Sequence, residues 1–152
     1  MSSGAEARLQ ELGIVLPALP SPGGTYVPAK TVGHIVYLSG VISASPEGVI
    51  TGTAGADRSV ADGYAAARAC ALTHLAVLKR HLGSLDAVKS VIAVNGYVNA
   101  VAGFADSSAV VNGASDLLVE VFGEAGKHVR AAVGMPALPR NALVEVQMMV
   151  EI

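Results

Sequence analysis

The last ten residues of the chain, LVEVQMMVEI, alternate between apolar and polar side chains. Successive side chains of a β-strand point to opposite faces of the sheet, so this period of two predicts a strand with two different faces. One face carries Val144, Val146, Met148, Val150 and Ile152, and the other carries Glu145, Gln147 and Glu151 together with Leu143 and Met149. The second set is too apolar for plain solvent and too polar for a core. We therefore expect helices on one face of the sheet and a subunit interface on the other.

Two amphipathic helices are available to cover that sheet. Apolar residues recur at steps of three and four residues over 59–82 and over 107–122. Ser59 is the expected N-cap of the first helix, and Gly83 and Gly123 are the expected stops. Each segment is long enough to lie across several strands.

Strand-like segments precede, separate and follow these helices. They lie at about 26–43, 87–101, 128–135 and 143–152, and Gly96 is expected to mark a bulge in the second of them. The resulting order is strands, helix, strand, helix, strand, strand. This order, with both helices free to cover one face of one sheet, predicts the α+β class.

The length of 152 residues is typical of one domain. Residues 1–22 are expected to form an N-terminal extension, with a short helix over 5–12 and then an extended arm containing Pro17, Pro20 and Pro22. Residues 23–152 are expected to form the main folded unit.

The composition favours a cytoplasmic oligomer. Hydrophobic residues make up 52% of the chain and charged residues 14%, which is more apolar surface than a monomer of this size readily hides. No apolar run is long enough for a bilayer span, and no secretory signal is expected at the N-terminus. The formal net charge of −2, with no Trp and two Phe, argues against a nucleic-acid partner.

The usual signatures of metal and phosphate sites are missing from the sequence. The four His residues are dispersed, so no metal site is expected. The segment TGTAGAD lacks the Lys of a P-loop, and Ser39 does not stand in a nucleophile elbow. Cys70, among Ala69, Ala71 and Leu72, is expected to be a buried core residue.

The alternation of side chains along the strand at 128–135 predicts which face of the sheet carries Arg130. In HVRAAVGM we expect Val129, Ala131, Val133 and Met135 to face the helices, and His128, Arg130, Ala132 and Gly134 to lie on the open face with Glu145. The small residues after Arg130 leave room for a ligand, whose carboxylate a guanidinium would bind with two hydrogen bonds. Spacing alone favours the alternative, an Arg130–Glu145 ion pair that only joins strands or subunits.

Two segments carry a resemblance to a known family. GGTYVPAKTVGHIVYLSG resembles the opening hairpin of the reactive-intermediate deaminase (Rid, or YjgF-like) family, and HVRAAVGMPALPRNALVEVQMMVEI is similar to its C-terminal signature. The segment VVNGASDLLVEVFGEAGKHVR looks like a subgroup of this family, which also carries an endoribonuclease label. The resemblance implies a chorismate-mutase-like fold with a mixed sheet and two helices on one face. It also implies a homotrimer that packs its sheets into a barrel, with a ligand cleft at each subunit interface.

The same resemblance implies an activity and roles for particular residues. Family deaminases hydrolyse small 2-imino or enamine acids to 2-keto acids and ammonia without a cofactor. Arg130 would hold the substrate carboxylate, and Glu145 would position or activate the attacking water. Tyr26 would wall the cleft from a neighbouring subunit, Gly40 would lend backbone polar groups, and Asn112 would contact the ligand.

Three departures from the family pattern leave a second function open. Val41 stands where Gln is typical, Ala132 replaces a Cys or Ser type of residue, and Gly134 replaces a Glu. Val41 and Ala132 would still line the pocket, but with fewer polar groups. A non-catalytic binder of small carboxylates is therefore the alternative to a deaminase. An endoribonuclease is a third possibility, which the net negative charge of the chain argues against.

Overall fold

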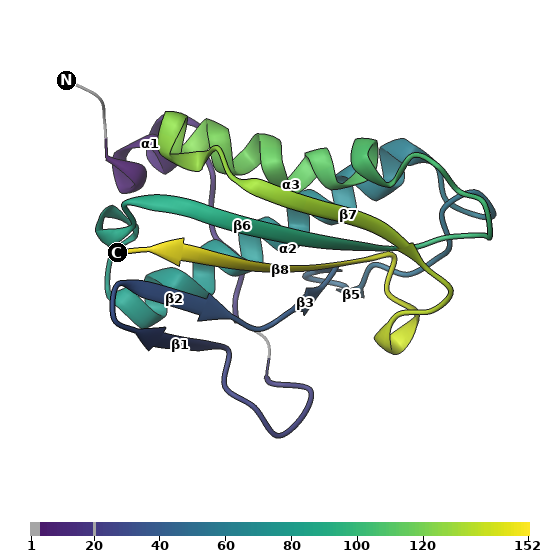
Figure 1. Cartoon of the computed structure of the whole chain (residues 1–152), viewed down its shortest axis with the longest axis horizontal. Helices are drawn as coiled ribbons and strands as arrows, with labels where there is room; N and C mark the ends of the chain where they lie inside the picture. Colours follow the sequence, from purple (N-terminus) through teal and green to yellow (C-terminus); the bar gives the residue numbers. More distant parts are fainter. Residues whose placement is uncertain (1–3, 20) are drawn as a thin grey trace.

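A mixed β-sheet forms one layer of the molecule and two long helices form the other (Figure 1). The computed structural model describes residues 4–19 and 21–152. The strands of the main sheet are β1 (Ala29–Val32), β2 (Ile35–Leu38), β3 (Val41–Ile42), β6 (Ser90–Asn99), β7 (Val129–Met135) and β8 (Val144–Glu151). Their order is β1-β2-β8-β6-β7, with β3 also paired to β8. Among the strand pairs of the described sheet only β6–β7 is parallel, and the strand order places β7 at one edge.

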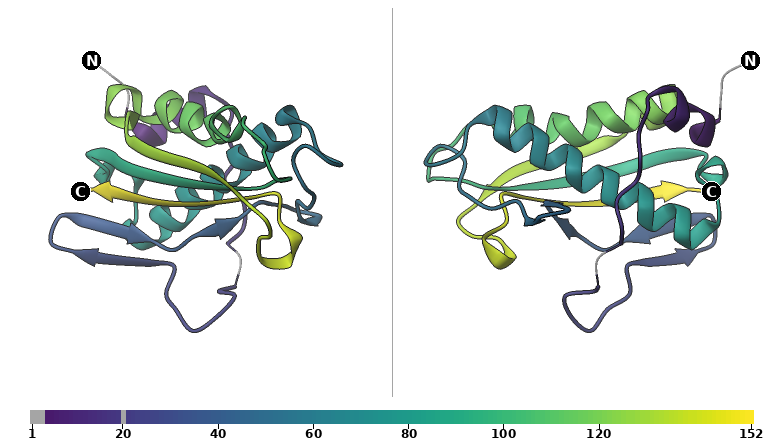
Figure 2. Two further views of the ribbon diagram at one scale, coloured as in Figure 1. Left: turned by 45° about the vertical axis from the view of Figure 1, so that its right-hand side comes forward. Right: turned by 180° about the vertical axis from the view of Figure 1, so that it is seen from behind.

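Helices α2 (Val60–Leu82) and α3 (Ser107–Phe122) lie side by side on one face of this sheet (Figure 2, right). Ser59 begins α2 as predicted, because its hydroxyl accepts from the backbone N–H of Asp62 while the Asp62 carboxylate accepts from the N–H of Ser59. Gly83 ends α2 in the left-handed region, and Gly123 follows α3. The predicted α+β class is confirmed. Among the described residues no helix is both long and apolar enough to span a membrane.

The last strand supplies the centre of the core. The side chains of Val144, Val146, Met148 and Val150 are fully buried beneath the helices, as the alternation predicts. Leu143 departs from that alternation, since it too is fully buried. It lies just before β8, where the chain has not yet adopted the strand and the period of two does not apply.

Glycines permit the close packing of the helical layer. The Cβ of an alanine at Gly113 of α3 would collide with the carbonyl oxygen of Tyr64 in α2. Gly96 has a similar role in β6, because a Cβ there would collide with Val111 of α3. The bulge expected at Gly96 was placed wrongly: the irregularity of β6 lies between Val91 and Ala93.

The first described residues pack onto the helical layer. Helix α1 (Ala5–Glu11) buries Ala5 and Leu9, and the Glu6 carboxylate accepts from the backbone N–H of Leu85 and pairs with Lys79 at 3.0 Å. Residues 1–3 and Pro20 of the expected extension lie outside the described residues. The division of the chain near Gly23 stays a prediction.

A short hairpin and three 3-10 turns complete the described structure. A small hairpin of β4 (Ala44–Ser45) and β5 (Gly48–Val49) precedes α2, and 3-10 turns follow at η1 (Leu85–Ala87), η2 (Gly123–Gly126) and η3 (Pro139–Asn141). The turn η3 lies in the loop expected between the last two strands.

Strand β7 faces the opposite way from our prediction. Its register pairs Arg130 with Val94 and Ala132 with Gly96, both on the helix-covered face of β6, so Arg130, Ala132 and Gly134 point toward α3. Val129, Ala131, Val133 and Met135 belong to the open face instead. Alternation correctly separated the two sets but could not tell which one faces the helices. The prediction places the more apolar set in the core, whereas at this sheet edge α3 offers polar partners.

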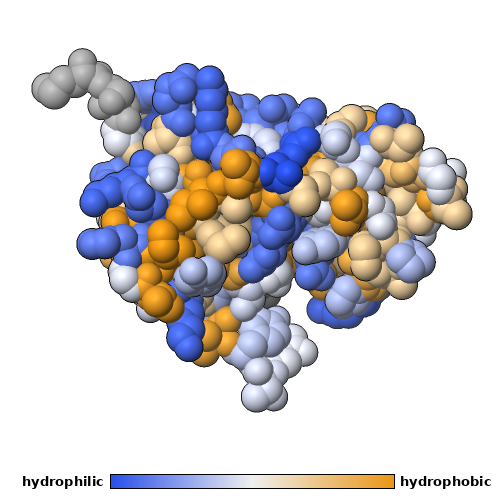
Figure 3. All heavy atoms as spheres, viewed as in Figure 1, coloured by the Kyte–Doolittle hydropathy of each residue, from blue (hydrophilic) through white to orange (hydrophobic). Residues whose placement is uncertain are grey.

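The open face of the sheet is consequently rich in apolar side chains. Figure 3 looks onto this face and shows an apolar band running across the strands. Exposed members of the set include Val129, with 70% of its surface accessible, and Val32, Tyr37 and Val133. Contiguous apolar surface of this kind is typical of an interface with another chain.

Candidate functional site

The guanidinium of Arg130 is fixed against α3 by three hydrogen bonds. Nη1 donates to Asn112 Oδ1 at 2.8 Å and to Ser115 Oγ at 3.1 Å, and Nη2 donates to the carbonyl oxygen of Ser108 at 3.3 Å. All three acceptors are neutral. Within residues 4–19 and 21–152, Arg130 is not a member of any ion pair. The cation is therefore held in place while its charge is left uncompensated by the chain.

His128 contacts Ser115, one of the three hydrogen-bond partners of Arg130. One ring nitrogen, Nδ1, lies 2.7 Å from the carbonyl oxygen of Gly126, and the other, Nε2, lies 2.8 Å from Ser115 Oγ. Neither Ser115 nor His128 was among the predicted site residues. A sequence signal did exist, since Ser115 follows Asn112 by one helical turn and His128 precedes Arg130 by two residues on the same strand face.

The predicted residues nearest to Arg130 are Asn112 and Ala132. Asn112 contacts Arg130 directly, and because its side-chain oxygen accepts that bond, its NH₂ group remains the part able to donate to a ligand. Ala132 follows on the same face of β7 and is half-buried against the core. Gly134 lies further along, beneath Ala100 and Ser107. No polar side chain thus follows Arg130 on this face of β7.

Glu145 and Gly40 form a second cluster on the open face. Glu145 pairs with Ile42 of β3 and Tyr97 of β6, and its carboxylate lies over Gly40, where a Cβ would be 2.5 Å from Oε2. The absence of a side chain at Gly40 is what lets the carboxylate occupy this position. Burial raises the pKa of Glu145, because a low-dielectric environment disfavours the charged form. A raised pKa makes this carboxylate a stronger proton acceptor than an ordinary glutamate.

The two clusters do not meet within one chain. Arg130 lies on the helix-covered side of β7 and Glu145 on the open side of β8, with β6 between the two strands. Two strand spacings separate the backbones by about 9–10 Å before the opposite directions of the side chains are considered. The Arg130–Glu145 ion pair that spacing allowed is absent within the protomer.

Neither Tyr26 nor Val41 places its side chain beside Arg130 or Glu145. Tyr26 belongs to the loop that precedes β1 and projects from the body of the molecule (Figure 1); its hydroxyl accepts from the backbone N–H of Gly23 at 3.1 Å. Val41 pairs with Val146 and packs against the core, so its side chain does not share the open face with Glu145.

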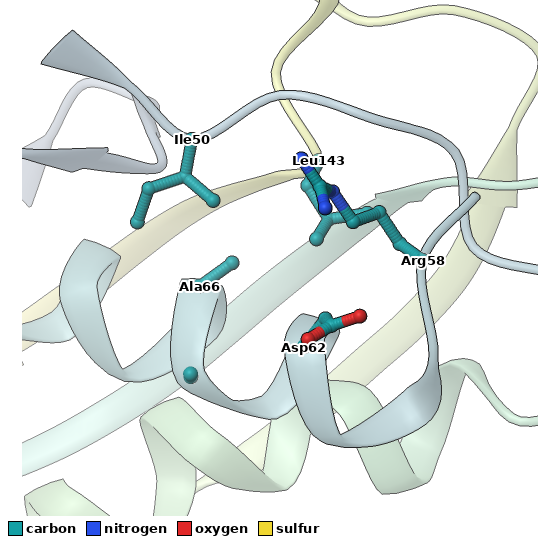
Figure 4. Close-up of a pocket in the computed structure, with 6 residues that line it drawn as sticks. Ile50, Arg58, Asp62, Ala66 and Leu143 are labelled. Carbon is teal, nitrogen blue, oxygen red and sulfur yellow. The ribbon is translucent and has the colours of Figure 1, made fainter.

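A pocket of about 300 Å³ lies elsewhere, beside the start of α2 (Figure 4). It is lined by Ile50, Arg58, Asp62, Ala65, Ala66 and Leu143. Its charged groups already have local partners, because Arg58 Nε donates to the carbonyl oxygen of Thr51 and Asp62 caps the helix. None of the predicted site residues reaches it. Over the described part of the chain, no three potential metal-ligating side chains come together.

Comparison with known proteins identifies the family. The model of the family described as "YjgF/chorismate_mutase-like, putative endoribonuclease" matches residues 6–152. The chain belongs to the YjgF family. Protein TCP17 of Trypanosoma cruzi is 45% identical over 148 residues, which cover 96% of this chain and 92% of that protein.

Two solved structures of similar proteins share the fold. A putative endoribonuclease from Shewanella oneidensis superposes with a TM-score of 0.93 at 35% identity, covering 99% of this chain and 100% of that one. Protein Atu1372 of Agrobacterium tumefaciens, described as having unknown function, gives a TM-score of 0.88 at 43% identity, covering 97% and 91% of the two chains. The chorismate-mutase-like fold implied by the sequence is therefore confirmed.

Proposed function

We propose that this YjgF-family protein binds small carboxylates at Arg130, in a cleft between subunits of a homotrimer, and hydrolyses 2-imino or enamine acids there. The observation that carries the proposal is the state of Arg130. A guanidinium whose hydrogen-bond partners are all neutral keeps its full charge available for an anion. Its position at the exposed edge strand leaves it accessible.

The separation of Arg130 from Glu145 supports a site built from two subunits. One chain offers a cation at the β7 edge and a carboxyl group on the opposite face of the sheet. The apolar open face supplies the surface through which a second chain would bring its own Glu145 toward Arg130. The projecting loop with Tyr26 would close the cleft from that neighbour.

The chemistry requires only water and a proton carrier. With the substrate carboxylate on Arg130, water attacks C2 of the iminium group and Glu145 accepts the proton that water loses, forming a carbinolamine. Glu145 then gives that proton to nitrogen and takes the proton of the carbinolamine hydroxyl as the C–N bond breaks, which releases ammonia and leaves the 2-keto acid. Ammonia finally takes the proton from Glu145 and leaves as ammonium, so the carboxylate is restored. The raised pKa of Glu145 suits both halves of this cycle.

A non-catalytic carboxylate binder is the second candidate. The observation that favours it is the apolar strand face after Arg130, where Ala132 and Gly134 provide no side-chain hydrogen bond to orient a water. A binder needs only the Arg130 clamp, whereas a hydrolase also needs Glu145.

An imine-decay assay separates the two. An amino-acid oxidase generates 2-iminopropanoate in situ, and its loss is followed with and without the protein. A deaminase accelerates the decay, and both Arg130→Ala and Glu145→Gln abolish the acceleration. No acceleration by the wild type rejects deamination. If the wild type still binds 2-oxobutanoate in that case, the non-catalytic binder is the function that remains.

A further inference from the structure

The hydrogen bonds around His128 define which atom carries each proton. The carbonyl oxygen of Gly126 can only accept, so the Nδ1 atom 2.7 Å away carries a hydrogen. In a neutral imidazole the other nitrogen is then an acceptor, and the Ser115 hydroxyl donates to Nε2 across 2.8 Å. The Ser115 hydrogen is thereby directed away from Arg130, and a lone pair on Oγ receives the Nη1–H of Arg130 at 3.1 Å.

The three hydrogen bonds to α3 leave part of the guanidinium unused. Nη1 donates to Asn112 and Ser115, and Nη2 donates to Ser108. In the described structure the Nε–H and the second Nη2–H of Arg130 have no partner. Nε and Nη2 lie on the same edge of the planar group, and that edge can donate two parallel hydrogen bonds to a carboxylate.

We infer that Ser115 and His128 are positioning residues that lock Arg130 against α3, so that its unused Nε–H and Nη2–H groups are held ready to receive one carboxylate. This inference rests on the proposed role of Arg130 in binding. An unanchored arginine loses rotamer freedom when it binds an anion, whereas an anchored one has already lost it. Removing the anchor therefore weakens binding without removing the charge.

The anchor is tested first without any ligand, by ¹⁵N NMR of the arginine side chains. A locked guanidinium gives separate Nη1 and Nη2 signals, which average when the group rotates. Arg130→Lys assigns the signals by their loss. We expect the Arg130 signals to be separate in the wild type, to average in Ser115→Ala and His128→Phe, and to separate again in Ser115→Thr, which keeps the hydroxyl. Exposed positions elsewhere provide matched controls, Ser45→Ala and His34→Phe, that leave the signals unchanged.

The effect on affinity follows by calorimetric titration with 2-oxobutanoate. Ser115→Ala and His128→Phe are expected to weaken binding about tenfold, the low end of what loss of one hydrogen bond to a charged group costs. Separate Arg130 signals and unchanged affinity in Ser115→Ala would overturn the inference. If neither the wild type nor Ser115→Ala binds, the proposed function fails, and the NMR comparison alone still decides whether the anchor exists.

Discussion

The side chain of Arg130 points toward α3 because that helix presents the hydrogen-bond acceptors for its guanidinium. Its parity with His128 and Ala132 was readable from the sequence, and the three do share one strand face. The direction of that face depended on the helix opposite, and on the polar groups of Asn112 and Ser115 that α3 presents there. No periodicity within the strand contains that information.

A buried histidine makes stability depend on pH. His74 is fully buried; its Nε2–H donates to the carbonyl oxygen of Val146 at 2.6 Å, and its Nδ1 has no partner among the described groups. Burial lowers the pKa of His74 to about 4 from its ordinary 6.5. As the pH falls, His74 is therefore protonated in the unfolded chain at a higher pH than in the folded chain.

The predicted consequence is a loss of stability between about pH 6.5 and pH 4, reaching on the order of 3 kcal/mol for this group. Denaturant unfolding as a function of pH measures it. His74→Leu is expected to flatten the pH dependence of the free energy of unfolding between about pH 6.5 and pH 4. Its stability at pH 7 also changes, so the slope is the quantity compared. The control His34→Phe is expected to retain the wild-type slope. An unchanged slope in His74→Leu would show that another group is responsible.

At the scale of elements, the helices were the most predictable part of the fold. Their apolar stripes and their caps at Ser59 and Gly83 are local signals, and the structure follows them closely. The close contact of α2 with α3 was not predictable, because Gly113 becomes informative only when Tyr64 is known to lie opposite. The same holds for Gly96 and Val111.

Gly113→Ala tests this contact. A methyl group there meets backbone, which cannot rotate away, so the helices must separate. We expect a loss of about 2–3 kcal/mol in the free energy of unfolding, measured by chemical denaturation. Gly23→Ala, where the added Cβ meets only the Tyr26 hydroxyl at 3.7 Å, is the control and should stay within about 0.5 kcal/mol of the wild type. Equal stability of the two variants would contradict the packing argument.

For the whole molecule, the sequence predicted a half-covered sheet, and that architecture is confirmed. The candidate site was predictable only in pieces: Arg130 with Asn112 in one cluster, and Glu145 with Gly40 in another. In the proposed trimer their relation depends on how chains assemble, which the residues of one chain do not specify. We propose that the apolar open face brings the two clusters together.

Assembly through that face is tested by adding charge to it. Val133→Asp places a carboxylate among apolar neighbours on the open sheet, and burial of an unpaired charge opposes association. Sedimentation velocity is expected to show a trimer for the wild type and a monomer for the variant. Val15→Asp changes a valine that is 89% exposed in the N-terminal arm and should leave the trimer intact. A wild-type monomer would remove the basis for a shared cleft.

Calorimetric titration of 2-oxobutanoate into the wild type and Arg130→Ala tests whether Arg130 is the carboxylate receptor. We predict one bound ligand per chain for the wild type and, for the variant, affinity weaker by at least about a hundredfold, since two charge-assisted hydrogen bonds are lost together. Binding of the ligand by Arg130→Ala with wild-type affinity would contradict the account.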